Sequence, residues 1–173
     1  MQEFIEDVKK AVEVMRQGGI ILYPTDTIWG IGCDASNSAA VRRIFELKRR
    51  SDSKSMLSLI DSDAKLGYYV PDIPDVAYDL MDLAEKPLTI IYDNVRHMAP
   101  ELIADDGSAG IRITREEFSR ELCRRMGVTI KGKYIKEWSA KSTANVLVVP
   151  YRTDETYSFL KSSIDMLIKI FSF

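Results

Sequence analysis

The sequence predicts a single α/β domain that spans residues 1–173. Short runs of apolar and β-branched residues alternate along the chain with segments whose apolar residues recur at helical spacing. Such alternation is typical of a sheet with helices packed against it. The length and the 46% hydrophobic content are enough for one core, and no internal repeat, low-complexity segment or linker divides the chain.

The first elements lead from a helix into a strand that ends at a proline. Residues 3–17 have the pattern of an amphipathic helix, which Gly18-Gly19 stops, and Ile20–Tyr23 is a buried strand that ends at Pro24. Ser38 is the candidate N-cap of the next helix. The later elements are expected, in order, as a helix over 38–49, a strand over 56–60, short helices over 63–69 and 75–84, strands over 88–92 and 109–113, a helix over 115–126, and late strands over 147–149 and 166–170.

Composition excludes several classes of protein. The net charge is −2, so no global field attracts the chain to nucleic acid or membrane. Cys33 and Cys123 are too few for a metal knuckle or a disulfide scaffold, which favours a reducing compartment. We find no signal peptide at the N-terminus and no run of about 20 apolar residues that could span a membrane. The sequence therefore predicts a soluble, cytoplasmic protein.

The charge is unevenly distributed. Residues 61–106 carry eleven acids and three bases, whereas residues 115–141 carry eight bases and four acids. A basic face could meet a phosphate-rich ligand, and two ordinary solvated surfaces would show the same pattern.

A polar turn follows the first strand, over Pro24-Thr25-Asp26-Thr27. Its hydroxyls and carboxylate can hold a small polar ligand. Gly30 and Gly32 allow the backbone to approach such a ligand closely, and Trp29 could wall a pocket. A simple strand-ending turn is the alternative interpretation, because these residue types also bond locally.

Lys48-Arg49-Arg50 closes the helix predicted over residues 38–49. If the helix ends at Lys48, an extended segment points Lys48 and Arg50 the same way. Lys54 and the serines at 51, 53 and 55 add donors for phosphate oxygens. The alternative is a solvated helix end, where cations also suit the helix dipole.

Ser108 to Arg112 form the third polar element. An arginine two residues into an apolar strand is costly unless it is paired or faces a cleft, and an edge strand beside an acid is the alternative. His97 is the only histidine and is expected on a surface loop. No P-loop, dinucleotide-binding fingerprint or metal-ligand spacing is present.

Together these elements resemble the YrdC-like family. That family shows G-G-x-(apolar)4-P-T-[DE]-T-x-[YW]-G-[LI]-x, then a helix leading into K-x-R, a P-L-T strand, a G-[IV]-R strand and an S-x-N motif. Gly18–Gly32, Ile44–Arg50, Pro87–Thr89 and Gly110–Arg112 match in order and spacing. The match covers about residues 5–128, and residues 129–173 diverge. The resemblance implies a twisted mixed sheet with flanking helices around a concave, positively charged cleft.

The resemblance also implies a function. Its well-studied members are nucleotidyltransferases that form threonylcarbamoyl-AMP and pyrophosphate from L-threonine, bicarbonate and ATP for the t6A modification of tRNA. Such enzymes need no protein nucleophile, because positioning and cations supply the rate. Mg²⁺ is expected on the ATP phosphates, with no protein metal site, and downstream tRNA-modification proteins are the expected partners.

Roles carry over to matching positions. Thr27 is similar to the threonine-binding hydroxyl, Lys48 and Arg50 to the catalytic K-x-R pair, Ser108 to a nucleotide-binding serine and Arg112 to the group that binds the amino-acid carboxylate. The residues expected at the site from the matched part of the chain are therefore Thr25, Thr27, Lys48, Arg50, Lys54, Ser108 and Arg112.

The chain departs from the family pattern after the K-x-R block. Ser51 and Ser55 stand where prolines are usual, and Leu59 replaces a histidine. Residues 129–141 are basic and polar with no strand pattern, where the family has its S-x-N strand. The nearest substitutes for that motif are Thr143 and Asn145, about ten residues late, and Ser163 resembles part of the late P-S-S segment.

Two further functions follow from these departures. A catalytically weakened paralogue could bind double-stranded RNA, tRNA or a nucleotide, with residues 115–141 extending the basic surface that the resemblance implies. A small-ligand-binding domain without chemistry is the third possibility. The matching Thr27, Lys48, Arg50 and Arg112 favour the enzyme.

Overall fold

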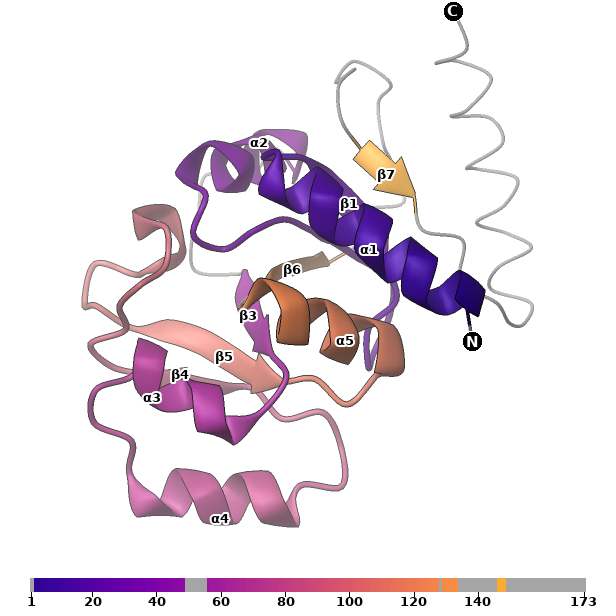
Figure 1. Ribbon diagram of the computed structural model, residues 1–173. Coiled ribbons are helices and arrows are strands. Elements are labelled where there is room, and N and C mark those ends of the chain that lie inside the picture. The colour runs from indigo at the N-terminus through magenta and orange to yellow at the C-terminus, as the bar shows by residue number, and fades with distance from the viewer. Residues whose placement is uncertain (1, 49–55, 128, 134–145, 149–173) are drawn as a thin grey trace, which may run out of the picture.

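The computed structural model describes residues 2–48, 56–127, 129–133 and 146–148 (Figure 1). Its elements are α1 (Gln2–Arg16), β1 (Ile20–Tyr23), β2 (Gly30–Gly32), α2 (Ser38–Lys48), β3 (Leu57–Ile60), η2 (Asp63–Lys65), α3 (Leu66–Tyr69), α4 (Asp75–Leu83), β4 (Ile90–Tyr92), η3 (Pro100–Leu102), β5 (Ala109–Ile113), α5 (Glu117–Met126), β6 (Thr129–Lys133) and β7 (Val146–Val148).

The predicted mixed α/β architecture is confirmed. Every element expected within the described residues is present, and its ends differ from the prediction by no more than two residues. The short helix expected over 63–69 is a 3₁₀ turn followed by one α-helical turn. The strand expected over residues 166–170 lies outside the described residues.

The start of α2 corrects one expectation. Asn37, rather than Ser38, caps this helix, because the Oδ1 atom of Asn37 accepts a hydrogen bond from the backbone N–H of Ala40 at 3.1 Å. The hydroxyl of Ser38 instead donates to Glu101 at 2.7 Å. That bond ties the first turn of α2 to η3.

A seven-stranded sheet runs in the order β4-β5-β3-β6-β2-β1-β7. β3 pairs in parallel with β5, and β1 with β7, whereas the other four pairings are antiparallel. Among the described strands, β6 alone joins the β4-β5-β3 half to the β2-β1-β7 half. The expectation that residues 129–141 hold no strand is therefore wrong for 129–133, since backbone pairing with two neighbours replaces the apolar pattern that was sought.

Two apolar clusters cover the sheet. Leu59 and Ile60 are neighbours in β3 and belong to different clusters, so the clusters lie on opposite faces. α1 and α5 lie side by side over one of them, as Figure 1 shows, and the ring of Phe4 meets Phe118 edge to face. That cluster consists of Val8, Ala11, Val12, Met15, Ile21, Tyr23, Leu59, Phe118, Leu122 and Cys123.

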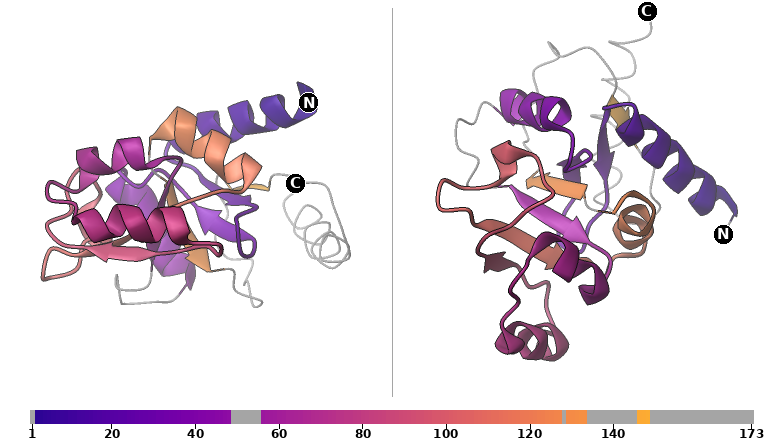
Figure 2. Two further views of the ribbon diagram at one scale, coloured as in Figure 1. Left: turned by 90° about the horizontal axis from the view of Figure 1, so that it is seen from below. Right: turned by 60° about the vertical axis from the view of Figure 1, so that its left-hand side comes forward.

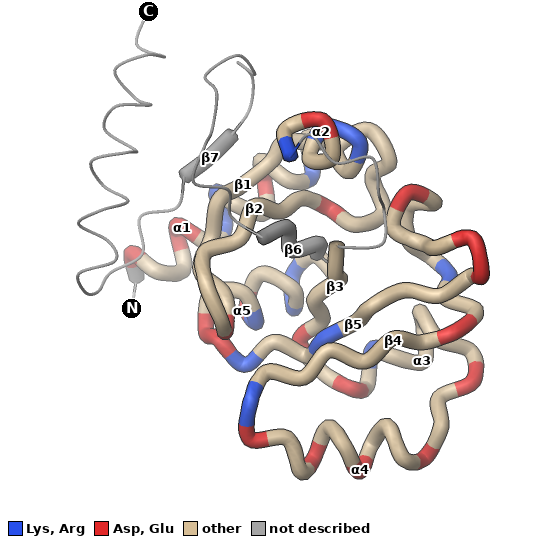
Figure 3. The backbone as a smooth tube through the Cα atoms, turned by 180° about the vertical axis from the view of Figure 1, so that it is seen from behind, with Lys and Arg blue, Asp and Glu red and all other residues tan. Residues whose placement is uncertain are grey.

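α4 lies at the end of the molecule away from α1 (Figure 2). Acidic residues follow one another along α4 and the loops beside β4 and β5, as Figure 3 shows. Residues 66–85 carry five acids and no base. Five of the eleven acids of residues 61–106 thus lie in this segment, with no base among them.

None of the described helices is both long and apolar enough to cross a lipid bilayer.

Proline at position 130 tests how far the fold depends on β6. Ile130 pairs with Ser58 in the middle of the sheet, where proline is not tolerated, so Ile130→Pro is expected to lower the free energy of unfolding by about 3 kcal/mol or more. Urea unfolding followed by circular dichroism measures this loss.

Glu117→Pro is the matched control. Position 117 is the first residue of α5, and the preceding residue, Glu116, has φ −67° and ψ 134°, a conformation that proline accepts after it. Equal unfolding midpoints for the two proline variants would contradict a central role for β6.

Candidate functional site

The turn between β1 and β2 is held by its own polar groups. The Thr25 hydroxyl donates to the carbonyl of Ile28, and the backbone N–H of Thr27 approaches the Thr25 Oγ1 atom at 3.5 Å. Pro24 is buried and fixes φ where the strand ends. Thr25 therefore shapes the turn, while the side chain of Thr27 lies exposed at its tip.

Asp26 points the other way, into the protein. Its side chain is 7% exposed, and its Oδ1 atom lies 3.3 Å from Nη1 of Arg112, whose side chain is 12% exposed. Both charged groups are therefore nearly withdrawn from water. A buried ion pair of this kind is screened little by salt.

A third group holds Arg112 from the opposite side. The register of β4 with β5 pairs Ile90 with Ile111, so extending it by one residue places Thr89 opposite Arg112. The hydroxyl oxygen of Thr89 accepts from Nε of Arg112 at 2.9 Å and from Nη2 at 2.7 Å. Asp26, Thr89 and Arg112, called the arginine cluster below, thus join the β1–β2 turn to β4 and β5.

The structure agrees with part of each interpretation of Arg112. β5 lies between β4 and β3, so Arg112 is not on an edge strand. It is nevertheless paired with an acid, Asp26. Among the described residues, no other cation is recorded in an ion pair with the polar turn.

Lys48 is the last residue of α2, and only 6% of its surface is exposed. Lysine is rarely buried to this degree, because its ammonium loses hydration. The helix was predicted over residues 38–49, and α2 ends one residue earlier, at Lys48.

Ser108 stands directly before β5. Its backbone N–H donates to Asp106 at 3.0 Å, and its carbonyl accepts from Ala104 at 2.8 Å. Because side chains alternate along a strand, Ser108, Gly110 and Arg112 face the same side of the sheet. Ser108, just before β5, and Arg112, near the end of β5, therefore face the same side of the sheet.

The remaining predicted site residues lie outside the described part of the chain. They are Arg50, Lys54, Thr143, Asn145 and Ser163.

His97 is exposed, as predicted for a surface loop. Its ring stacks on Tyr68 with 4.2 Å between the ring centroids. Its φ of 62° is unusual for a residue other than glycine, and the stacked ring accompanies this strained backbone. His97 makes no contact with the arginine cluster in the interactions that the structure records.

Sequence reasoning missed two members of the arginine cluster as functional residues. Asp26 was noted only as a carboxylate in the turn, and Thr89 only as part of a matching block. The signal for Thr89 is its place one residue before a strand that pairs with the strand of Arg112. Asp26 is separated from Arg112 by 86 residues, so no local pattern indicates their contact.

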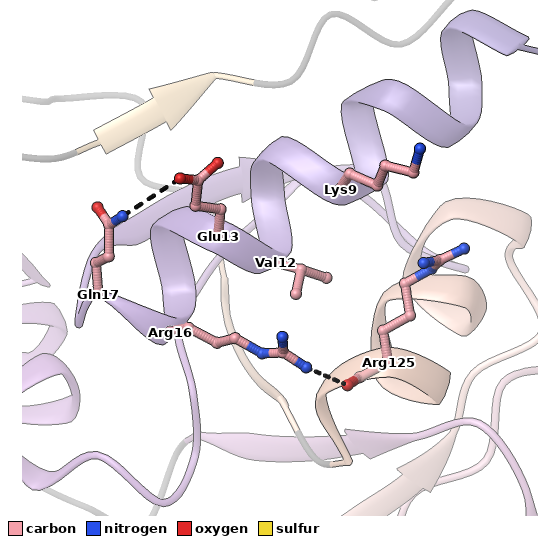
Figure 4. Close-up of a pocket in the computed structure, with 6 residues that line it drawn as sticks. All are labelled: Lys9, Val12, Glu13, Arg16, Gln17 and Arg125. Carbon is pink, nitrogen blue, oxygen red and sulfur yellow. Dashed lines mark hydrogen bonds between the residues drawn. The ribbon is translucent and has the colours of Figure 1, made fainter.

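Two cavities lie elsewhere. One of about 450 Å³ opens between α1 and α5 and is lined by Lys9, Val12, Glu13, Arg16, Gln17 and Arg125, with Arg16 donating to the carbonyl of Arg125 at 3.4 Å (Figure 4). Arg16 and Arg125 stand in the last turns of α1 and α5, where they stabilise the helix dipoles.

The second cavity, of about 520 Å³, lies at the carboxyl ends of the parallel strands β3 and β5, where ligands often bind in α/β sheets. Its lining includes Leu88, Ile113 and Thr114, which flank Thr89 and Arg112 in sequence. Arg115, which also lines this cavity, donates hydrogen bonds to the carbonyls of Met81 and Ala84 at 3.2 and 2.7 Å. These bonds satisfy carbonyl groups at the C-terminal end of α4.

No group of three or more His, Cys, Asp or Glu side chains able to hold a metal occurs in the described ranges.

A family model matches residues 13–169 of the chain. It is the Sua5/YciO/YrdC model, whose description reads "Telomere recombination". The match covers most of the 173 residues and includes the polar turn, Lys48 and the arginine cluster.

Curated relatives are about a third identical to this chain within the aligned segment. The threonylcarbamoyl-AMP synthase of Pseudomonas aeruginosa PAO1 is 32% identical over 121 residues, which are 69% of this chain and 65% of that protein. The synthase of the same name from Thiobacillus denitrificans is 32% identical over 117 residues, 67% of this chain and 62% of that protein. The chain thus matches just under two thirds of the length of these relatives.

Solved structures share the fold. P. abyssi Sua5 complexed with L-threonine superposes with a TM-score of 0.66 at 25% identity, covering 72% of this chain and 37% of that one. E. coli YciO superposes with a TM-score of 0.69 at 20% identity, covering 82% of this chain and 76% of that one.

Removing Arg112 tests the energetics of the arginine cluster. Arg112→Met leaves the Asp26 carboxylate buried without its cation, and we expect the free energy of unfolding to fall by about 3–5 kcal/mol. Asp26→Asn added to Arg112→Met should recover part of that loss, because the uncompensated charge is gone. Additive effects in this double-mutant cycle, measured by urea unfolding, would show that the two side chains do not interact.

The pH dependence of stability tests the contacts of α5. Arg124 and Arg125 donate to Glu121 at 2.6–2.7 Å, and the hydrogen bonds from Arg124 above all lower the pKa of that carboxyl to about 2. A lowered pKa stabilises the fold above the unfolded pKa of about 4.3, and this contribution is lost as the pH falls towards 2.

Glu121→Gln should therefore lower the free energy of unfolding by about 1 kcal/mol at pH 6, the size expected for an ion pair near the surface. The loss should become progressively smaller between pH 5 and pH 2. Thermal unfolding of both proteins across this range measures the difference, with Glu85→Gln as the control for loss of an exposed carboxylate. A difference that stays constant down to pH 2 would contradict the assignment.

Proposed function

The chain belongs to the Sua5/YciO/YrdC family, and from that membership we propose that it is a threonylcarbamoyl-AMP synthase. The proposed reaction joins L-threonine, bicarbonate and ATP into threonylcarbamoyl-AMP and pyrophosphate, for the t6A modification of tRNA in the cytoplasm. The enzyme is then a nucleotidyltransferase whose product passes to downstream tRNA-modification proteins.

The arginine cluster is the observation that carries this proposal. Arg112 is a nearly buried guanidinium that Thr89 holds with two hydrogen bonds, so its orientation is set before a ligand arrives. A guanidinium fixed in this way suits a planar carboxylate, the group that every amino-acid substrate presents. The Sua5 of P. abyssi, at 25% identity, has been crystallised with L-threonine, which agrees with an amino-acid site.

The proposed chemistry needs no protein nucleophile. The threonine amine takes up bicarbonate with loss of water to give a carbamate, and a carbamate oxygen attacks the α-phosphorus of ATP as pyrophosphate leaves. Arg112 binds the threonine carboxylate, and Thr27 on the exposed turn bonds its hydroxyl. These contacts would lower the barrier mainly by positioning the amine and the phosphate.

The phosphate end of the reaction is assigned to the cations after α2. Lys48 is withdrawn from water at the end of that helix, where a positive charge acts more strongly on a developing phosphate charge than it would in solvent. Arg50, Lys54 and Ser108 are proposed to bind the nucleotide beside it. Mg²⁺, held by the ATP phosphates, would neutralise the leaving pyrophosphate.

The surface charge at one end of the molecule disfavours duplex RNA binding there. Residues 66–85, including α4, carry five acids and no base, and such a surface repels a phosphate backbone.

A pyrophosphate-release assay tests the proposal. Release should require L-threonine, bicarbonate and ATP together. Lys48→Met keeps an unbranched side chain of similar length and removes the charge, and it should lower kcat by about 100-fold or more.

His97→Ala is the control, because His97 lies on an exposed loop and should leave kcat within about twofold of the parent, as expected for a surface change. Folding of each variant is checked by its thermal unfolding. Folded parent protein that releases no pyrophosphate with all three substrates present would contradict the proposed activity.

A further inference from the structure

The carboxylate of Asp26 uses only one of its two oxygens. Oδ1 faces Arg112, whereas Oδ2 is buried and accepts no hydrogen bond from any residue that the structure describes. A buried carboxylate oxygen without a hydrogen-bond donor destabilises the fold, because it has lost its hydration and no protein donor replaces the water. The site therefore holds an acceptor that a ligand could satisfy.

The contact with Arg112 is also incomplete. A bidentate arginine–carboxylate pair makes two parallel bonds of about 2.7–2.9 Å, whereas Asp26 receives one bond of 3.3 Å. Two of the three nitrogens of Arg112 instead share the single hydroxyl oxygen of Thr89. Of the five N–H donors of a guanidinium, two stay available after these three bonds.

The unused groups match the two charges of a zwitterion. Arg112 offers N–H donors for a carboxylate. Asp26, which is hydrogen-bonded to Arg112, offers an acceptor for an ammonium. The Asp26–Arg112 pair carries no net charge, so a zwitterion entering it brings no uncompensated charge into a buried site. A carboxylate ligand without an ammonium would leave the Oδ2 atom unsatisfied.

The turn keeps Asp26 in this position. Pro24 fixes the backbone where β1 ends, and the Thr25 hydroxyl closes the turn on the carbonyl of Ile28. The turn that carries the Asp26 carboxylate is thus held by its own contacts, independently of Arg112.

We propose that Asp26 determines substrate specificity by accepting a hydrogen bond from the α-ammonium of the amino acid whose carboxylate Arg112 binds. This inference rests on the proposed function and adds to it a residue that selects α-amino acids against hydroxy acids and other amine-free carboxylates.

Calorimetric titration with two ligands tests the inference. The probes are L-threonine and (R)-3-hydroxybutyrate, which keeps the carboxylate and the hydroxyl and lacks the ammonium. The parent protein should bind threonine about 10- to 100-fold more tightly, the range expected for one hydrogen bond between charged groups.

Asp26→Asn keeps the shape and the Oδ1 acceptor and removes the negative charge. It should weaken threonine binding by a similar factor of about 10–100 and change the affinity for 3-hydroxybutyrate and ATP by less than about threefold. The matched control is Asp72→Asn, at an exposed aspartate, which should change none of the three affinities.

The outcomes separate this inference from the proposed function. Parent protein that binds both probes equally overturns the inference, whether or not the Asp26 variant folds. An Asp26→Asn variant that folds and retains full threonine affinity also overturns it, while the proposed function stands. Parent protein that binds neither probe overturns the proposed function and the inference together.

Discussion

The ion pair between Asp26 and Arg112 is the interaction on which the organisation of the site depends. Asp26 belongs to the turn after β1, and Arg112 belongs to β5, in the other half of the sheet. Without this contact the polar turn would carry a buried carboxylate with no cation, and β5 would carry a buried guanidinium with no acid. The ion pair therefore fixes the position of the β1–β2 turn relative to β5. Apolar packing alone is less directional and would fix it less closely.

Much of the fold could be predicted from local patterns. The helices α1, α2 and α5 have clear apolar periodicity, and the strands β1, β3 and β5 are apolar runs, so each was placed to within two residues. β2 and β6 were not predicted. Gly30–Gly32 has few side chains that favour a strand, and Lys131, Gly132 and Lys133 interrupt any apolar pattern in β6. Backbone pairing with neighbouring strands is what shows that both are strands.

The candidate site shows the same division. Thr27, Lys48 and Arg112 could be chosen from sequence because each belongs to a motif whose spacing is local. The roles of Asp26 and Thr89 depend on contacts across 86 and 23 residues, which only the register of the sheet brings about. The burial of Lys48 was equally beyond a pattern argument, because a helix end is usually solvated.

The position of β6 sets an order of assembly during translation. β2 and β3 each pair with β6, so both can complete their pairing only after residues 129–133 have left the ribosome. At about 5–20 residues per second, several seconds separate the synthesis of Ile60 from that of Thr129. Throughout that interval the facing edges of β2 and β3 expose unpaired backbone groups to other chains. The nascent protein is therefore a natural client for a chaperone that shields strand edges, and slower translation before residue 129 would prolong its exposure to aggregation.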